Sequence, residues 1–173
     1  MPPGSIIGAL NPLRNRNAIP EQLFLPTYQN RLRLVGRHLD INDYRSVCIL
    51  DVEGGILVRA FSPRAHTSEL LEFPDDAFVE MVRSSIQARG SRKRARKGSP
   101  VVPTGYEDLL RALGWELDQR LAKAITIQEN SNSLFVAGLA AGDNATGAFS
   151  PFDYLLGEAE VQAMLDAAFA RRA

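Results

Sequence analysis

The sequence predicts an α+β fold in which a helix–β-hairpin–(strand)–helix unit occurs twice and builds one domain around an antiparallel sheet. Three observations predict it: amphipathic helix patterns, short apolar runs joined by turn residues, and an internal similarity. Shifting the chain by 78 positions aligns residues 28–61 with 106–139 without a gap, and eight of the 34 positions are identical. The identical pairs are Tyr28/Tyr106, Leu32/Leu110, Arg33/Arg111, Gly36/Gly114, Leu39/Leu117, Asp40/Asp118, Ile49/Ile127 and Val58/Val136.

This self-similarity predicts a tandem internal duplication. The alternative is a chance likeness between two amphipathic helix–hairpin units. We divide the chain into an arm (residues 1–27), a first unit (28–89), a basic linker (90–105) and a second unit (106–173). Each unit is small for independent stability, so we expect both to share one core around a pseudo-twofold axis.

Each unit opens with an amphipathic helix whose apolar residues recur at spacings of three and four. The stripes are Leu32, Val35 and Leu39 in the first unit, and Leu110, Leu113, Leu117 and Leu121 in the second. Thr27 is the expected cap of the first helix, and Thr104 with Glu107 matches a capping box before the second. Gly36 and Gly114 cost helix stability, so they predict close packing against the sheet or the other unit.

A β-hairpin follows each opening helix. The expected segments are 46–52, a turn at 53–55 and 56–61 in the first unit, and 124–129, a turn at 130–133 and 134–139 in the second. The first hairpin is apolar on both faces, which predicts a place nearer the centre of the sheet. Cys48, the only cysteine, lies in this apolar run, and we expect a packed thiol without a disulfide.

Each unit is predicted to close with a short third strand and a helix. The strands are expected at 69–73 and, with a weaker pattern, at 148–154. The helices follow with acidic residues in their first turns, where negative charge suits the helix dipole. Their apolar stripes are Phe78, Met81, Val82 and Ile86 in the first unit, and Val161, Met164, Leu165, Ala168 and Phe169 in the second.

The arm, residues 1–27, holds five of the ten prolines together with several apolar clusters. Proline at this density excludes a helix along its whole length. The apolar clusters favour packing against the body, with docking on a partner or a second protomer, or disorder, as the alternatives. No apolar run reaches 18 residues, so no membrane span is expected, and a cytoplasmic location is the default expectation.

The net charge of zero conceals an uneven distribution. Residues 89–105 carry six basic and no acidic groups, whereas residues 28–88 and 106–173 both carry a net negative charge. The six cations are Arg89, Arg92, Lys93, Arg94, Arg96 and Lys97. They are the candidate contacts to phosphates of a nucleic acid, and the absence of interleaved aromatic residues predicts purely electrostatic binding. A solvated linker, or one that folds onto the acidic units, is the alternative.

No pattern in the sequence identifies a catalytic, metal or cofactor site, so we expect none. Asp51 and Glu53 flank a glycine turn, where solvation of the turn explains them better than acid–base chemistry. His38 and His66 are the only histidines and lack the context of a nucleophile pair or a metal site. The glycine-rich stretch 138–147 lacks the Gly-Lys-Ser/Thr of a phosphate loop.

These observations predict a non-enzymatic interaction protein, such as a small adaptor, chaperone or assembly factor. Another protein chain or a second copy is the expected partner. The architecture loosely resembles that of α+β secretion-chaperone-like domains, although no motif identifies that family. The alternative hypotheses are a nucleic-acid-associated protein that binds phosphates through the basic linker and an enzyme with a novel site.

Overall fold

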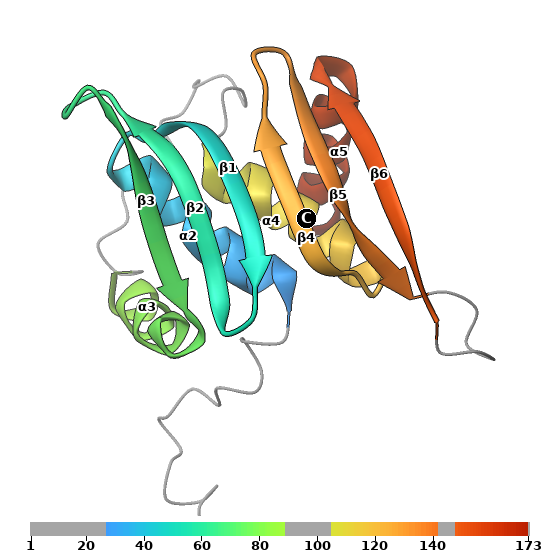
Figure 1. Ribbon diagram of the computed structural model, residues 1–173, viewed down its shortest axis with the longest axis horizontal. Coiled ribbons are helices and arrows are strands. Elements are labelled where there is room, and N and C mark those ends of the chain that lie inside the picture. Colours follow the sequence, from blue (N-terminus) through green and yellow to red (C-terminus); the bar gives the residue numbers. More distant parts are fainter. Residues whose placement is uncertain (1–26, 89–104, 142–147, 173) are drawn as a thin grey trace, which may run out of the picture.

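The computed structural model describes residues 27–88, 105–141 and 148–172 as an α+β fold with four helices and one antiparallel sheet of six strands (Figure 1). The predicted α+β class is confirmed. The elements are α2 (Tyr28–Ile41), β1 (Arg45–Val52), β2 (Gly55–Ser62), β3 (Thr67–Pro74), α3 (Asp75–Ala88), α4 (Tyr106–Gln119), β4 (Lys123–Glu129), β5 (Ser133–Ala141), β6 (Phe149–Gly157) and α5 (Glu158–Arg172). The order helix, three strands, helix therefore occurs twice along the chain.

The strands lie in the order β3-β2-β1-β4-β5-β6, and every neighbouring pair is antiparallel. At the centre, β1 pairs with β4 through Cys48–Gln128, Ile49–Ile127 and Leu50–Thr126. The prediction that the first hairpin lies nearer the centre is wrong, because each hairpin contributes one central strand. The two third strands are longer than predicted, and each pairs along its whole length with the hairpin beside it.

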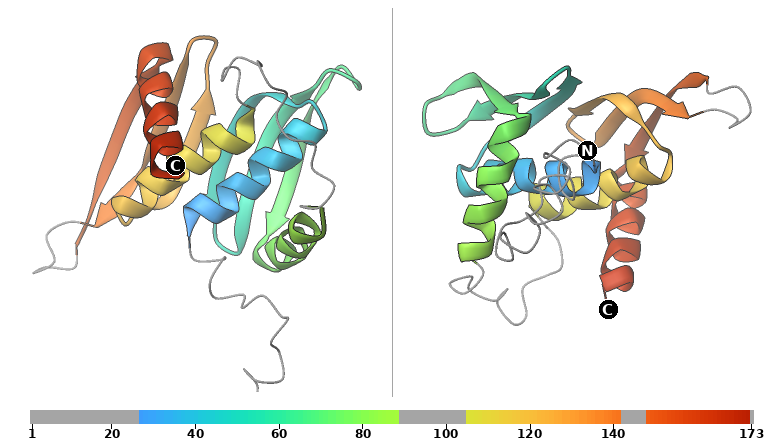
Figure 2. Two further views of the ribbon diagram at one scale, coloured as in Figure 1. Left: turned by 180° about the vertical axis from the view of Figure 1, so that it is seen from behind. Right: turned by 90° about the horizontal axis from the view of Figure 1, so that it is seen from below.

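All four helices lie on one face of the sheet (Figure 2). α2 and α4 lie side by side beneath the central strands, α3 packs against α2 and β3, and α5 packs against α4 and β6. The α2 and α4 helices are antiparallel, since Asp118 near the end of α4 contacts the first amide groups of α2. The opposite face of the sheet is not covered by any element among the described residues.

The core lies between the sheet and the α2–α4 pair. Its fully buried side chains come from the predicted helix stripes and from the helix-facing side of the strands. The largest are Phe78, Leu32, Leu39, Ile49, Ile56, Leu110, Leu113, Leu117, Ile125, Ile127, Val35 and Val58. Burial of this apolar surface is the main favourable contribution to folding. Leu121, predicted to extend the second stripe, instead lies beyond the end of α4 with 64% of its surface exposed.

Two helical glycines permit the close approach of α2 and α4. A Cβ atom on Gly36 would lie 2.5 Å from the carbonyl oxygen of Tyr106, and one on Gly114 would lie 2.6 Å from Cα of Gln29. Both obstacles are backbone atoms of the facing helix and not flexible side-chain ends. The predicted close packing of these glycines is confirmed, and the surface they contact is the other helix and not the sheet.

The predicted N-cap residue of α2 is confirmed, whereas the N-cap of α4 is not the predicted one. Thr27 occupies the N-cap position of α2 but makes no side-chain capping hydrogen bond, and Gly105 is the N-cap of α4. Thr104 lies outside the described residues. Each helix receives a carboxylate from the far end of the other: Asp118 accepts from the amides of Tyr28 and Gln29 at 2.8 and 3.1 Å, and Asp40 accepts from those of Tyr106 and Glu107 at 2.8 and 3.0 Å.

Cys48 lies on the uncovered face of the sheet and is half-buried, so its thiol is less buried than a packed thiol would be. Its neighbours Val47 and Ile49 point to the opposite face and are buried. No helix in the described ranges has both the length and the apolar character needed to cross a membrane.

Candidate interaction surface

The six cations predicted to contact phosphates, Arg89, Arg92, Lys93, Arg94, Arg96 and Lys97, lie outside the described residues. The arm up to residue 26 lies outside them as well. The structure therefore does not test either segment. Within the described part, Asp51 and His38 contact neighbouring side chains, whereas Glu53 and His66 lie exposed in turns.

Asp51 at the end of β1 accepts a hydrogen bond from the hydroxyl of Tyr28, the first residue of α2. Burial and this bond raise the pKa of the Tyr28 hydroxyl above its ordinary value. Glu129 at the end of β4 accepts from Tyr106 in the same way at 2.7 Å, and burial again raises the pKa of the hydroxyl. These carboxylates therefore fasten the start of each opening helix to the sheet. Glu53 lies exposed in the β1–β2 turn.

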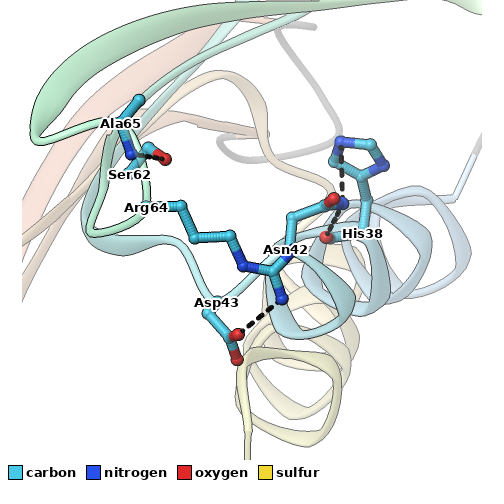
Figure 3. Close-up of polar contacts among 6 residues, drawn as sticks. All are labelled: His38, Asn42, Asp43, Ser62, Arg64 and Ala65. Atoms are coloured by element: carbon cyan, nitrogen blue, oxygen red, sulfur yellow. Dashed lines mark hydrogen bonds and ion pairs between the residues drawn. The ribbon is translucent and has the colours of Figure 1, made fainter.

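The two histidines lie apart from these carboxylates. The His38 ring stacks on Tyr44 with centroids 6.2 Å apart and meets Phe73 edge-on at 5.5 Å. Burial lowers the pKa of its imidazole, so the neutral ring is favoured. Asn42 donates to the carbonyl oxygen of His38 at 2.9 Å, beside the exposed Arg64–Asp43 ion pair at 3.1 Å (Figure 3).

His66 lies exposed in the turn between β2 and β3, with left-handed backbone at φ 53°. In the parts of the chain that the structure describes, no three His, Cys, Asp or Glu side chains gather as metal ligands would. The polar residues singled out from the sequence thus do not converge on one site.

The uncovered face of the sheet is the most distinctive surface of the described structure, and in Figure 1 it points towards the viewer. Strand pairing arranges its side chains in rows across all six strands. One row is Leu70, Arg59, Cys48, Gln128, Phe135 and Leu155, from β3 to β6. The next row is Glu72, Leu57, Leu50, Thr126, Ala137 and Asp153. We call this surface the open face.

Apolar side chains dominate the open face. Seven large apolar side chains of the described residues are strongly exposed, and five of them lie here: Leu50, Val52, Leu70, Phe149 and Leu155. Leu70 and Leu155, at the two ends of one row, expose 61% and 63% of their surface. Single exposed apolar residues are ordinary, but the gathering of five of them on one face of a sheet is more typical of an interaction site.

Several charged groups lie on the open face. Arg59 lies within the first row, Glu72 and Asp153 lie at the two ends of the second row, and the Lys123 ammonium lies 3.6 Å from the centroid of the Phe149 ring. A hollow of about 420 Å³ lies over β1 and β2, and its lining includes Cys48, Leu57 and Arg59. The face therefore combines exposed apolar side chains with a shallow depression and with charged groups of both signs.

The sequence contained one signal for this surface. The two-sided apolar pattern of the first hairpin is visible in residues 46–61, but it does not distinguish a strand covered on both faces from one left open on the second. The chain matches no protein-family model, no curated protein and no solved structure.

Proposed function

We propose that this protein is a non-enzymatic interaction protein, an adaptor, chaperone or assembly factor, that binds a protein surface through the open face. The observation that carries the proposal is the concentration of exposed apolar side chains on one face of the sheet. In water, apolar area left exposed costs about 25 cal/mol per Å², so its burial by a partner would be favourable. The polar candidates support the same function, because Asp40, Asp51, Asp118 and Glu129 are engaged in holding helices.

We also infer that the two halves of the domain are copies of one ancestral unit. The offset of 78 that aligns the sequences also relates the contacts of the two halves. The Tyr28–Asp51 bond corresponds to the Tyr106–Glu129 bond, and the capping by Asp118 corresponds to that by Asp40. The central register pairs Ile49 with Ile127, which are themselves equivalent positions, as a twofold axis at that pair requires.

Irregular backbone supports the duplication more strongly than regular elements do, because chance likeness would not repeat it. Both central strands carry a register shift, at 45–48 and at 123–126, and each shift holds a residue with positive φ, Ser46 at 53° and Ala124 at 51°. Both opening helices also end alike. Asp43 and Leu121 have φ of 57° and 51°, and the next amide in each case bonds five residues back, as in a Schellman motif.

The interaction proposal is tested by a matched pair of double variants. Leu70→Asp with Leu155→Asp places two charges on the open face at side chains that are already more than 60% exposed, so the fold should tolerate them. Ile41→Asp with Leu121→Asp changes two equally exposed side chains, each 64%, that lie away from the open face. Circular dichroism verifies that both variants are folded.

Tagged wild-type protein and both double variants are incubated with extract of the source cells, and the retained proteins are quantified by mass spectrometry. We expect a partner that the wild type and the control variant retain and the open-face variant loses at least about tenfold. Equal retention by all three proteins would refute the open face as the binding surface.

A nucleic-acid-associated role is the second candidate, and the cationic segment favours it. Six cations within nine residues, Arg89 to Lys97, stand between two halves of net negative charge. Such a segment would bind phosphates without sequence preference. Replacing the six residues by serine and glycine tests it: an unchanged affinity for RNA and DNA at low salt would exclude this role.

A further inference from the structure

We propose that the occupant of the open face is a second copy of this chain, packed sheet against sheet. The proposal rests on the proposed function, because it names the partner of the same surface. Strands lie about 4.8 Å apart and rise about 3.3 Å per residue, so six strands of about eight residues cover roughly 750 Å². A stable interface buries about 800 Å² on each partner. The open face therefore has the extent that a stable dimer needs.

A symmetric pairing of the two rows is complementary at Phe135 and at Arg59. A twofold axis that runs across the strands, between the two rows, would set each residue of one row opposite the residue of the other row on the same strand. Phe135 would then lie opposite Ala137 of the second copy, a large side chain against a small one. Arg59 would lie opposite Leu57 of the second copy and beside its Glu72, so the cation within the first row gains a carboxylate. At the two edge strands the same axis sets Leu70 opposite Glu72 and Leu155 opposite Asp153.

The edges of the sheet argue against the other way to form a β-sheet dimer, the addition of strand to strand. β6 carries Pro151, which lacks a backbone donor, and Asp153. β3 carries Glu69 and Glu72. Proline and charged side chains on edge strands oppose edge-to-edge pairing. Face-to-face packing avoids these edges and follows the ordinary arrangement of two stacked sheets about 10 Å apart.

The test is the molar mass of the full chain in solution. Sedimentation equilibrium over a concentration series compares the wild type, the Leu70→Asp/Leu155→Asp variant and the Ile41→Asp/Leu121→Asp control. We expect a dimeric wild type and control, and an open-face variant whose dimer dissociation constant is raised at least about 100-fold. If the double variant fails to fold, as judged by circular dichroism, the single Leu155→Asp variant replaces it.

Two outcomes overturn the second copy as occupant. One is a wild type that stays monomeric to about 100 μM, and the other is a dimer that the open-face variant leaves intact. The experiment that measures proteins retained from cell extract distinguishes failure of the dimer proposal from failure of the proposed function. A monomeric wild type whose partner is lost only in the open-face variant would refute the second copy and leave the interaction role standing.

Discussion

Asp118 and Asp40 cap α2 and α4 in the same way, but the charges near the two carboxylates differ. Asp118 caps α2, whose first turn has no acidic residue, whereas Asp40 caps α4, whose first turn contains Glu107 and Asp108. Asparagine keeps an oxygen that accepts from the same amides and removes only the charge. We therefore compare Asp118→Asn with Asp40→Asn.

The expected magnitudes follow from the charges near each cap. Asn and Asp are about equally good capping residues, so the hydrogen bonds themselves change little. Asp118→Asn loses the attraction between a carboxylate and the helix dipole and should lower the free energy of unfolding by about 1 kcal/mol. Asp40→Asn loses the same attraction but removes a charge that burial and the repulsion from Glu107 and Asp108 disfavour. We expect its stability to lie within about 0.5 kcal/mol of the wild type.

The two variants should also differ in their pH dependence. Burial, with the nearby charges of Glu107 and Asp108 adding to it, raises the pKa of the Asp40 carboxyl above its ordinary value of 3.8. A raised pKa in the folded state means that this group favours folding below pH 3.8 and that its contribution is lost as the pH rises through the folded-state pKa. Asp40→Asn should therefore gain stability relative to the wild type between acidic and neutral pH.

Urea denaturation, followed by circular dichroism and by the fluorescence of Trp115, the only tryptophan, measures both effects. The slopes of the unfolding transitions should agree, so that differences in midpoint report stability. If Asp40→Asn lowers the free energy of unfolding as much as Asp118→Asn or more, the inferred repulsion between Asp40 and the acidic first turn of α4 is contradicted. A stability difference between the Asp40 variant and the wild type that stays constant with pH would contradict it as well.

Leu121 has left-handed backbone and an exposed side chain. Leu121→Gly should therefore raise the free energy of unfolding, measured by urea denaturation, by about 1 kcal/mol. A decrease would contradict backbone strain at this residue. Gly36→Ala and Gly114→Ala should each lower the free energy of unfolding by about 2–3 kcal/mol, because the added methyl group meets the backbone of the facing helix. Near-wild-type stability would show that the two helices can move apart at little energetic cost. The buried Tyr154 hydroxyl has no hydrogen-bond partner among the described residues, so Tyr154→Phe should unfold at the same or slightly higher urea concentration. If the cations within residues 89–97 bind nucleic acid, log affinity should fall with log salt at a slope of about −5, measured by filter binding, and the serine–glycine variant should lose this dependence.

Local patterns sufficed to predict most elements of the fold. Apolar spacing located all four described helices, and turn residues located both hairpins, because these features depend on side chains close in the sequence. The close packing at Gly36 and Gly114 was also predictable, since a glycine that costs helix stability needs a reason that packing can supply. The caps were not predictable. Asp40 and Asp118 belong to the opposite helix, and only tertiary structure brings them to the amides that they bind.

The errors at β1 have a common physical origin that bears on the function. Cys48, Leu50 and Val52 alternate with the buried residues of the same strand, and a strand that is apolar on both sides is ordinarily one that is covered on both sides. The pattern therefore predicted a place near the centre of the sheet for the first hairpin and a packed thiol. The chain has helices for one face only among its described elements, so the second apolar face is left exposed. A second cover for β1 would have to come from outside the described elements, and this mismatch between the strand pattern and the available helices is the physical basis of the proposal that the open face binds a partner.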